Sequence, residues 1–494
     1  MFQKITPESA GISSKAITAF IKRLEKRGAT MHGVLFMKGD KIFTEAYWKP
    51  FHQDYTHRQY SQTKSFVGIA IGLLEEEGKL SLDDKIVDYF PEKIEETPNR
   101  YLQQQTIREM LMMKTVGSSS AWFVSNNPDR TNHYLSEKRN FHPSNTLWAY
   151  DSAGSQVLCA LVEKLAKKPL LEYLKDKLFN AMGAFQTASV LKTPNGDSWG
   201  DSAMVCTLRD MATFGRFVMN YGVWNGQRLM NEKYLRDATS ALVNNRISSH
   251  YSAYHQGYGY QIWRVCGGGF AFVGMGDQLT VCYPEKDLLF ACNSDNQGTP
   301  LLRALIFQSL EETIVDEIKD VALTENAQDL EELNELIAGL KLRSVSGVPD
   351  SPLRDVINGV EYTCEENPMG ITKFSFVFTD KTKGEFRYTN AQGDKVLPFG
   401  VNYNVFGKFP QLGYSNEQGA VPTTDGFTYG DAVSLAWTDE NGLLLFVQII
   451  DKYFGNMNAR FHFRGDEVYA VFQKTAEAFL SEYQGALLGK KAEK

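Results

Sequence analysis

The stretch that decides the fold is Tyr60–Leu80, "YSQTKSFVGIAIGLLEEEGKL". Ser61 and Lys64 stand three positions apart and precede an almost unbroken run of apolar residues. Apolar side chains that cover nearly every side of a helix predict a buried, central helix. Because residues three apart share one face of a helix, we expect the hydroxyl of Ser61 and the amine of Lys64 to meet at its N-terminal end.

This pair suits nucleophilic chemistry. Burial disfavours the charged form of an amine, so a buried Lys64 can take the proton of Ser61 and turn its hydroxyl into a nucleophile. The unpaired N–H groups at the start of the helix, including that of Ser61, can stabilise an oxyanion. However, Ser-x-x-Lys also arises by chance, and Ser61 equally suits a helix N-cap. The hypothesis therefore needs support from other stretches.

Length and charge limit the class of protein. A chain of 494 residues predicts two or three domains. Its formal net charge of -7 argues against a nucleic-acid partner, which calls for a basic patch. No stretch approaches the roughly 20 apolar residues of a membrane helix, no secretory signal is visible, and the six cysteines are scattered singly. We therefore expect a cytoplasmic protein without a nucleic-acid or membrane partner.

Signals for metal and phosphate binding are missing. The sequence contains neither an H-E-x-x-H motif nor a G-x-x-x-x-G-K-[ST] loop, so we expect no metal and no cofactor. His32 and His57 belong to no recognisable motif, and we expect them at the surface or in local hydrogen bonds.

The order of helix and strand patterns predicts an α+β fold with a helical insertion. A helix and two strands open the chain, helices follow from Ser61, and strands with a closing helix return near residue 257. Alternation at strand period and the Asn441-Gly442 turn predict an antiparallel β domain at the C-terminus, ending in a short helix. The predicted boundaries are 1–325 for the first domain (sheet part about 1–60 and 245–325, helical part about 61–244), 326–345 for a linker helix and 346–494 for the β domain.

Two further stretches support the Ser61 hypothesis. Tyr150 and Ser152 lie just before a predicted helix, at a turn where a tyrosine can point into a cleft, although an aromatic contact in the core explains Tyr150 equally well. Residues 270–295, "FAFVGMGDQLTVCYPEKDLLFACNSD", read as a strand interrupted by Gly274 and Gly276. Glycine inside a strand marks a β-bulge or the close approach of a ligand.

Ser61-x-x-Lys64, Tyr150-x-Ser152 and the glycine-rich strand, in this order, resemble the serine β-lactamase and penicillin-recognising superfamily. The similarity is greatest to class C β-lactamases, D-alanyl-D-alanine peptidases, family VIII carboxylesterases and 6-aminohexanoate-dimer hydrolases. "GKLSLDDKIVDYFPE", "TIREMLMMKTVG" and "GYGYQIW" resemble the same group, and the similarity covers roughly Pro7 to Asp320. The resemblance implies a β-lactamase-like antiparallel sheet flanked by helices.

The resemblance also implies an acyl-enzyme mechanism on a small-molecule ester or amide. Ser61 would attack the carbonyl carbon, and Lys64 and Tyr150 would share proton transfer, with the identity of the base left open. The oxyanion would rest on the backbone N–H groups of Ser61 and Met275. The positions assigned to oxyanion or substrate binding are Ser152, Gly274, Met275, Gly276 and Gln278.

The third motif departs from the pattern of the β-lactamases and peptidases. They usually carry Lys-Thr-Gly or His-Thr-Gly, whose cation helps to bind a substrate carboxylate, whereas this chain has Gly274-Met275-Gly276-Asp277, with an acid and no cation. Ser152 also replaces the asparagine of many relatives. We therefore expect neutral substrates, while a true β-lactamase or D-Ala-D-Ala carboxypeptidase, or a non-catalytic penicillin-binding-type sensor, remains an alternative. The oligomeric state is not predicted.

Overall fold

The structure, a computed structural model, describes residues 2–493 except 95–96, 118–126, 138–140, 247–252, 300, 413–425 and 477–479. The chain divides into two compact units, residues 1–341 and residues 342–494. No helix in the part of the chain that the structure describes combines the length and the hydropathy needed to cross a membrane.

A seven-stranded sheet forms the centre of the first unit, with strand order β1-β3-β2-β12-β11-β10-β9. Neighbouring strands run antiparallel except for the parallel pair β1 and β3. The N-terminal hairpin thus pairs with strands that follow more than 200 residues later, because β2 binds β12. The strands are β1 (Gln3–Lys4), β2 (Met31–Lys38), β3 (Lys41–Tyr47), β9 (Trp263–Arg264), β10 (Phe270–Gly274), β11 (Gln278–Tyr283) and β12 (Leu288–Ser294).

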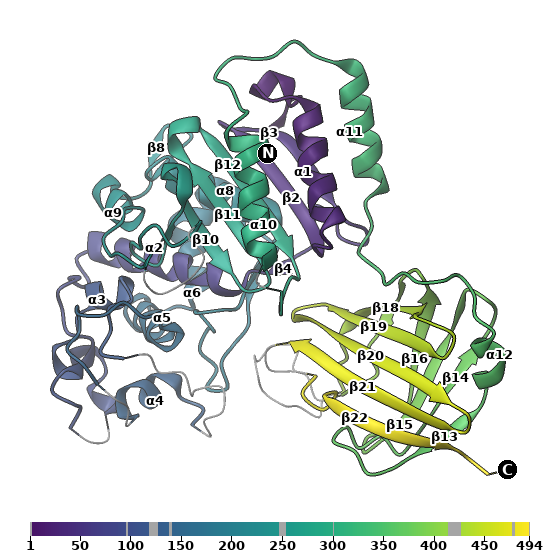
Figure 1. The fold of residues 1–494 in the computed structure, drawn as a ribbon. Coiled ribbons are helices and arrows are strands. Elements are labelled where there is room, and N and C mark those ends of the chain that lie inside the picture. The colour runs from purple at the N-terminus through teal and green to yellow at the C-terminus, as the bar shows by residue number, and fades with distance from the viewer. Residues whose placement is uncertain are drawn as a thin grey trace. The chain divides into compact units, whose positions relative to one another are not determined.

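Helices cover both faces of this sheet (Figure 1). α1 (Ser14–Lys26), α10 (Leu301–Leu310) and α11 (Ala327–Gly339) pack together against one face, and α8 (Leu208–Met219) packs on β2, β11 and β12 from the other. α11 covers the segment expected to link two domains. It packs on α1 with Leu333 buried, and it belongs to the first unit.

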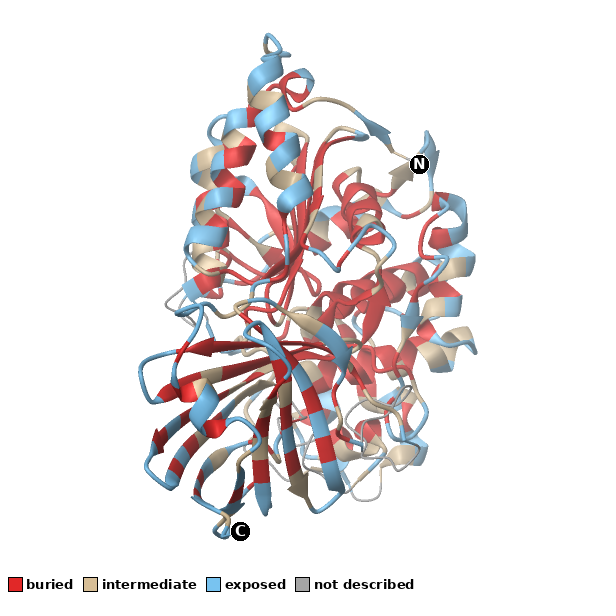
Figure 2. Ribbon diagram, turned by 90° about the vertical axis from the view of Figure 1, so that its right-hand side faces the viewer, coloured by how far each residue is buried: buried red, intermediate tan, exposed pale blue. Residues whose placement is uncertain are grey.

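The helical part is arranged around α2 (Thr63–Glu76), which follows a 3-10 turn, η2 (Tyr60–Gln62). Every residue of α2 from Thr63 to Leu74 is buried, so the predicted central helix is confirmed (Figure 2). The break predicted at Pro169 is also confirmed, since it separates α5 from α6. The other helices are α3 (Ile107–Leu111), α4 (Arg130–Ser136), α5 (Ser152–Ala166), α6 (Leu170–Leu174), α7 (Asn180–Met182) and α9 (Glu232–Ala238), and short strands are β4 (His57–Arg58), β5 (Ser189–Val190), β6 (Met204–Cys206), β7 (Val223–Trp224) and β8 (Gln227–Arg228).

The glycine-rich stretch differs from the expected interrupted strand. β10 and β11 form an antiparallel hairpin in which Gly274 pairs with Gln278, and Met275, Gly276 and Asp277 make the turn. The chain reverses here because Gly276 and Asp277 adopt positive φ angles of 73° and 68°. The expectation of one strand was wrong, since glycine in a strand pattern marks a reversal as well as a bulge.

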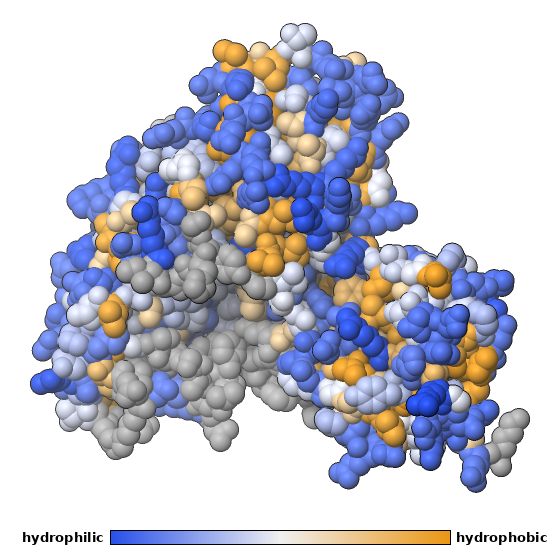
Figure 3. All heavy atoms as spheres, in the orientation of Figure 1, coloured by the Kyte–Doolittle hydropathy of each residue, from blue (hydrophilic) through white to orange (hydrophobic). Residues whose placement is uncertain are grey.

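The second unit is a ten-stranded sheet, antiparallel along its length, that closes through pairing of β16 with β18. Strands such as β15 and β20 alternate buried with more exposed residues (Figure 2), whereas β18 and β19 are buried almost throughout. Hydrophobic residues on the surface of this unit lie in separate groups among hydrophilic ones (Figure 3). The predicted antiparallel β domain is therefore confirmed, but it ends in strand β22 rather than a helix. Its elements are α12 (Leu353–Ile357), β13 (Glu361–Cys364), β14 (Lys373–Phe378), β15 (Lys383–Asn390), β16 (Gly393–Val401), β17 (Val405–Lys408), β18 (Gly430–Trp437), β19 (Gly442–Ile450), β20 (Phe454–Arg464), β21 (Glu467–Ala476) and β22 (Gly485–Lys491).

The close packing of α2 yields a stability prediction. A Cβ atom at Gly72 would lie 2.5 Å from Met230 Cε and 2.5 Å from Cε1 of Tyr234, whose hydroxyl donates to Gly68 O. Gly72→Ala should therefore lower the free energy of unfolding by about 1–3 kcal/mol through overpacking, as measured by urea denaturation. The matched control is Gly339→Ala at the end of α11, where a Cβ meets nothing within 4 Å, and it should be neutral or stabilising by up to ~1 kcal/mol. Equal stabilities of the two variants would contradict the close approach at Gly72.

Candidate active site

Ser61 lies in the 3-10 turn at the entrance of α2, behind a residue with an unusual backbone. Tyr60 has a φ of 48°, a left-handed conformation that non-glycine residues rarely adopt. Hydrogen bonds hold it there: Thr63 Oγ1 donates to Tyr60 O at 2.6 Å and accepts from Met204 N at 3.0 Å, and Gln59 N donates to Met204 O at 2.8 Å. The turn therefore gives Ser61 one fixed position.

Lys64 makes the contact that the spacing predicts. Its Nζ donates to Ser61 Oγ at 3.0 Å and to the backbone oxygen of Asp201 at 2.6 Å. The carboxylate of Asp201 lies 3.8 Å from the same nitrogen, and both side chains are only 2% exposed. The amine thus lies in a buried polar site between the candidate nucleophile and an acid.

Asp201 was not identified from the sequence. It stands in a loop after Trp199 whose only signal is the dipeptide Gly-Asp, and it lies 137 residues from Lys64 along the chain. Arg58 anchors the loop by donating from Nε to Ser202 O at 3.0 Å, and its guanidinium covers the Trp199 ring at 4.5 Å. Within the described residues, Asp201 Oδ1 is buried without a hydrogen-bond partner. The carboxylate is therefore oriented chiefly toward Lys64.

Tyr150 joins the pair from the segment before α5. Its ring centroid lies 5.1 Å from Lys64 Nζ, and the ring stacks on Trp263 with 5.5 Å between centroids. Asp151, rather than Ser152, is the N-cap of α5, accepting from Gly154 N at 3.0 Å. Ser152 is the first residue of the helix. The cap fixes the backbone next to Tyr150, so the ring has a defined place beside Lys64.

The β10–β11 turn lies against the Ser61 turn. A Cβ atom at Gly274 would lie 2.4 Å from Gln59 O, so only glycine permits this approach. Gln278 is fully buried, and its Nε2 donates to Met275 O at 3.0 Å and to Ser294 O at 2.6 Å. Gln278 thus positions the turn that carries Met275, behind the surface that a substrate would meet.

A cation does approach the third motif, contrary to the expectation from the sequence. Arg303 of α10 donates from Nε to Asp277 Oδ1 at 2.7 Å and from Nη2 to Gly274 O at 3.1 Å. Burial raises the pKa of the Asp277 carboxyl, and the charge of Arg303 opposes this shift. The acid of the turn is therefore paired with a cation, which the motif itself does not contain.

Two buried histidines lie near the Ser61 turn in the chain or against that segment: His57 in strand β4, which leads to Ser61, and His32 in β2, which meets it. His57 Nδ1 donates to Arg58 O at 2.9 Å. Because a neutral imidazole has one donor and one acceptor nitrogen, His57 Nε2 accepts from His32 Nδ1 at 2.9 Å. Both were expected at the surface or in local hydrogen bonds, and both are buried. Burial lowers the pKa of His57 to about 3, and burial together with His57 lowers the pKa of His32 well below its ordinary value.

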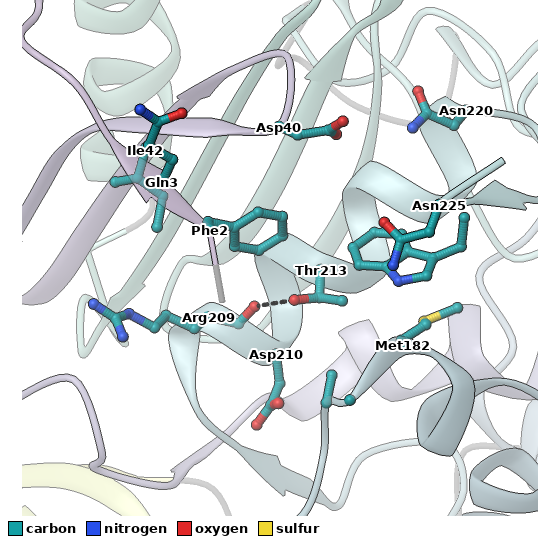
Figure 4. Close-up of a pocket in the computed structure, with 13 residues that line it drawn as sticks. Phe2, Gln3, Asp40, Ile42, Met182, Arg209, Asp210, Thr213, Asn220 and Asn225 are labelled. Atoms are coloured by element: carbon teal, nitrogen blue, oxygen red, sulfur yellow. Dashed lines mark hydrogen bonds between the residues drawn. The ribbon is translucent and has the colours of Figure 1, made fainter.

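The described residues outside this site offer little competing chemistry. They include no cluster of His, Cys, Asp or Glu side chains that would hold a metal ion. A pocket of about 550 Å³ is lined by Phe2, Trp224, Arg209 and neighbouring residues, none of which belongs to the Ser61 site (Figure 4). The charge of Arg209 is already paired with Glu45 at 2.7 Å.

Residues 17–308 match the family model described as β-lactamase. The chain belongs to the β-lactamase family. It is 24% identical to a 6-aminohexanoate-dimer hydrolase of Paenarthrobacter ureafaciens over 247 residues, which are 47% of this chain and 63% of that protein. It is 23% identical to an uncharacterized protein of Alkalihalophilus pseudofirmus over 242 residues, 44% of this chain and 66% of that protein. The chain thus spans somewhat less than two thirds of the length of these curated relatives.

Solved structures show the same fold. A putative 6-aminohexanoate-dimer hydrolase from Bacillus anthracis superposes with a TM-score of 0.51 and 16% identity, covering 64% of this chain and 86% of that one. The structure of SurE with D-Leu superposes with a TM-score of 0.50 and 11% identity, covering 97% and 99% of the two chains. The predicted β-lactamase-like fold is therefore confirmed, and these hydrolase-type relatives place the chain in a family of serine hydrolases.

The histidine pair yields a pH prediction. An unfolded histidine binds a proton below a pKa of about 6.5, whereas His57 stays neutral in the folded protein down to about 3. The contribution of these histidines to the free energy of unfolding is therefore fully present above about pH 6.5. It decreases as the pH falls, by up to ~1.4 kcal/mol per pH unit for each such histidine. Urea denaturation at pH 7 and pH 5 measures this loss.

The control for this prediction is His57→Gln, whose amide keeps a donor for Arg58 O but does not titrate. It should show a smaller difference in stability between the two pH values than the wild-type protein. An unchanged difference would show that His57 is not the group responsible.

Proposed function

We propose that the protein is a serine hydrolase that cleaves a small ester or amide through an acyl-enzyme. The observation that carries the proposal is the partly buried hydrogen bond of 3.0 Å from Lys64 Nζ to Ser61 Oγ, with the ring centroid of Tyr150 5.1 Å from the same nitrogen. A hydroxyl beside a positioned amine and a phenol, one of which accepts its proton while the other supports the transfer, is the arrangement of an activated nucleophile.

In the proposed reaction, Ser61 Oγ attacks the carbonyl carbon and loses its proton to the Lys64–Tyr150 pair. The carbonyl oxygen becomes an oxyanion that accepts hydrogen bonds from the N–H groups of Ser61 and Met275. Collapse of this intermediate breaks the ester or amide bond, and the departing alcohol or amine receives the proton. A water molecule then gives a proton to the same pair and attacks the acyl carbon; the bond to Ser61 Oγ breaks, the carboxylic acid leaves, and Ser61 Oγ takes back the proton.

The surroundings of Lys64 favour Tyr150 as the proton acceptor. Lys64 Nζ already donates to Ser61 Oγ and Asp201 O, and the Asp201 carboxylate lies 3.8 Å away. Such a set of acceptors suits the three N–H groups of an ammonium ion. A cation at this place stabilises negative charge on Tyr150, so we propose that Tyr150 takes the proton from Ser61 and that Lys64 supports it electrostatically.

The charge balance of the third motif supports neutral substrates. Arg303 is paired with Asp277, so it offers a substrate carboxylate no uncompensated charge. A missing charge-assisted hydrogen bond costs about 1.5–3 kcal/mol, roughly ten- to a hundredfold in rate. Similarity to a 6-aminohexanoate-dimer hydrolase supports amides as well as esters. Preferred turnover of a β-lactam or a D-Ala-D-Ala peptide would instead identify a β-lactamase or carboxypeptidase, and acylation without turnover would identify a sensor.

The nucleophile is tested by covalent labelling. A fluorophosphonate probe should modify Ser61, as located by peptide mass spectrometry, and Ser61→Ala should lose labelling and reduce ester hydrolysis by several orders of magnitude. The matched control is Ser65→Ala, one turn along α2, where the buried hydroxyl donates to Gln261 O at 2.8 Å. This variant should still be labelled. Persistent labelling of Ser61→Ala would refute Ser61 as the nucleophile.

The role of Tyr150 is tested by removing its hydroxyl alone. Tyr150→Phe keeps the ring that stacks on Trp263, so KM should change little while kcat falls by about 10²–10⁴-fold. Tyr258→Phe serves as the control, because Tyr258 packs on the same tryptophan with 5.0 Å between centroids and has no place in the proposed reaction. Steady-state kinetics with a neutral nitrophenyl ester measure kcat and KM for both variants. A kcat of Tyr150→Phe close to that of the wild type would exclude the phenol of Tyr150 from proton transfer.

A further inference from the structure

The turn beside Ser61 holds an ion pair that the proposed reaction does not use. We propose that Asp277 determines substrate specificity, because its carboxylate occupies the guanidinium of Arg303 and so denies this group to the carboxylate of a substrate. The inference rests on the proposed function, since it concerns which esters or amides reach Ser61.

The guanidinium lies next to the proposed oxyanion donor. Arg303 Nη2 donates to Gly274 O, and Gly274 directly precedes Met275 in the chain. Gly274 in turn packs on Gln59 O, two residues before Ser61. Arg303 therefore contacts the strand end that packs against the Ser61 turn, and the proposal places the anionic group of a substrate on this side of the turn.

Within the pair, the cation is the more accessible partner. The Arg303 side chain is 21% exposed and that of Asp277 is 5% exposed. The guanidinium also lies over the ring of Tyr254, 5.2 Å from its centroid. Of its five N–H groups, one on Nε is committed to Asp277 and one on Nη2 to Gly274 O, and the guanidinium also hydrogen-bonds the Tyr254 side chain. In this proposal Arg303 is the anion-binding residue, and the less exposed Asp277 neutralises it.

The negative charge at Asp277 is not required by the backbone. With a φ of 68°, position 277 suits glycine and asparagine at least as well as aspartate. Asparagine would also offer an acceptor to Arg303 Nε, and it would avoid the desolvation of a buried carboxylate. An acidic residue supplies two things here that asparagine does not: a second acceptor oxygen, since Asp277 also hydrogen-bonds the Asn296 side chain, and the negative charge that neutralises Arg303.

Asp277→Asn tests the proposal directly. The substrates are 3-acetoxybenzoate, which carries a carboxylate, and its neutral methyl ester, and the quantity of interest is the ratio of their kcat/KM values. Releasing a guanidinium to a substrate carboxylate should raise this ratio about ten- to a hundredfold over the wild type. Asp277→Gly, which also suits the positive φ, should raise it in the same direction and covers the case in which the asparagine variant does not fold.

The double variant Asp277→Asn/Arg303→Gln is the matched control. Without the guanidinium, the ratio should return to the wild-type value, because the gain depends on the cation. An unchanged ratio in both Asp277 variants, or a gain that persists in the double variant, would overturn the proposal.

Failure of the proposed function can be told apart from failure of this inference. If the wild type hydrolyses neither ester, the proposed function fails, and binding then tests the inference alone. NMR titration compares the affinity for benzoate with that for benzamide. Benzoate should gain about tenfold or more relative to benzamide in Asp277→Asn and should gain nothing in the double variant, whereas no gain in Asp277→Asn would refute the inference.

Discussion

Burial of one amine organises the site around the entrance of α2. Lys64 is almost inaccessible to solvent, and an isolated charge in such a place loses several kcal/mol of solvation. The protein compensates with Ser61 Oγ, Asp201 O and the Asp201 carboxylate, which come from the start of the helix and from a distant loop. Any rearrangement of the loop or the turn would leave the amine unsolvated, so the amine holds the parts of the site together.

The backbone around Ser61 is held with similar stringency. Tyr60 keeps a left-handed conformation that costs about 1–3 kcal/mol, and the hydroxyl of Thr63 ties that residue to the strand β6. Gly274, at the end of β10, packs closely against the backbone oxygen of Gln59. For the proposed nucleophile, a position fixed between α2 and the end of β10 means little reorganisation before attack, which is the property that electrostatic catalysis requires.

The third motif carries an ion pair that balances a buried carboxylate. Arg303 and Asp277 lie 26 residues apart in sequence and meet at the β10–β11 turn. The pair satisfies the carboxylate of Asp277 and at the same time compensates the charge of Arg303. The proposed preference for neutral substrates follows from this compensation.

The sequence by itself determined the features that depend on local geometry. The spacing of Ser61 and Lys64 defined their contact because a helix brings residues three apart to one face, and the apolar run after them identified α2 as a buried helix. Tyr150 and the glycine-rich turn were found because they stand in a recognisable order. Only the tertiary structure decided that Asp201 faces Lys64, that Arg303 pairs with Asp277 and that His32 meets His57. These contacts join segments that lie 137, 26 and 25 residues apart, and no local periodicity encodes which distant side chain balances a buried charge; that choice is made by the packing of the whole unit.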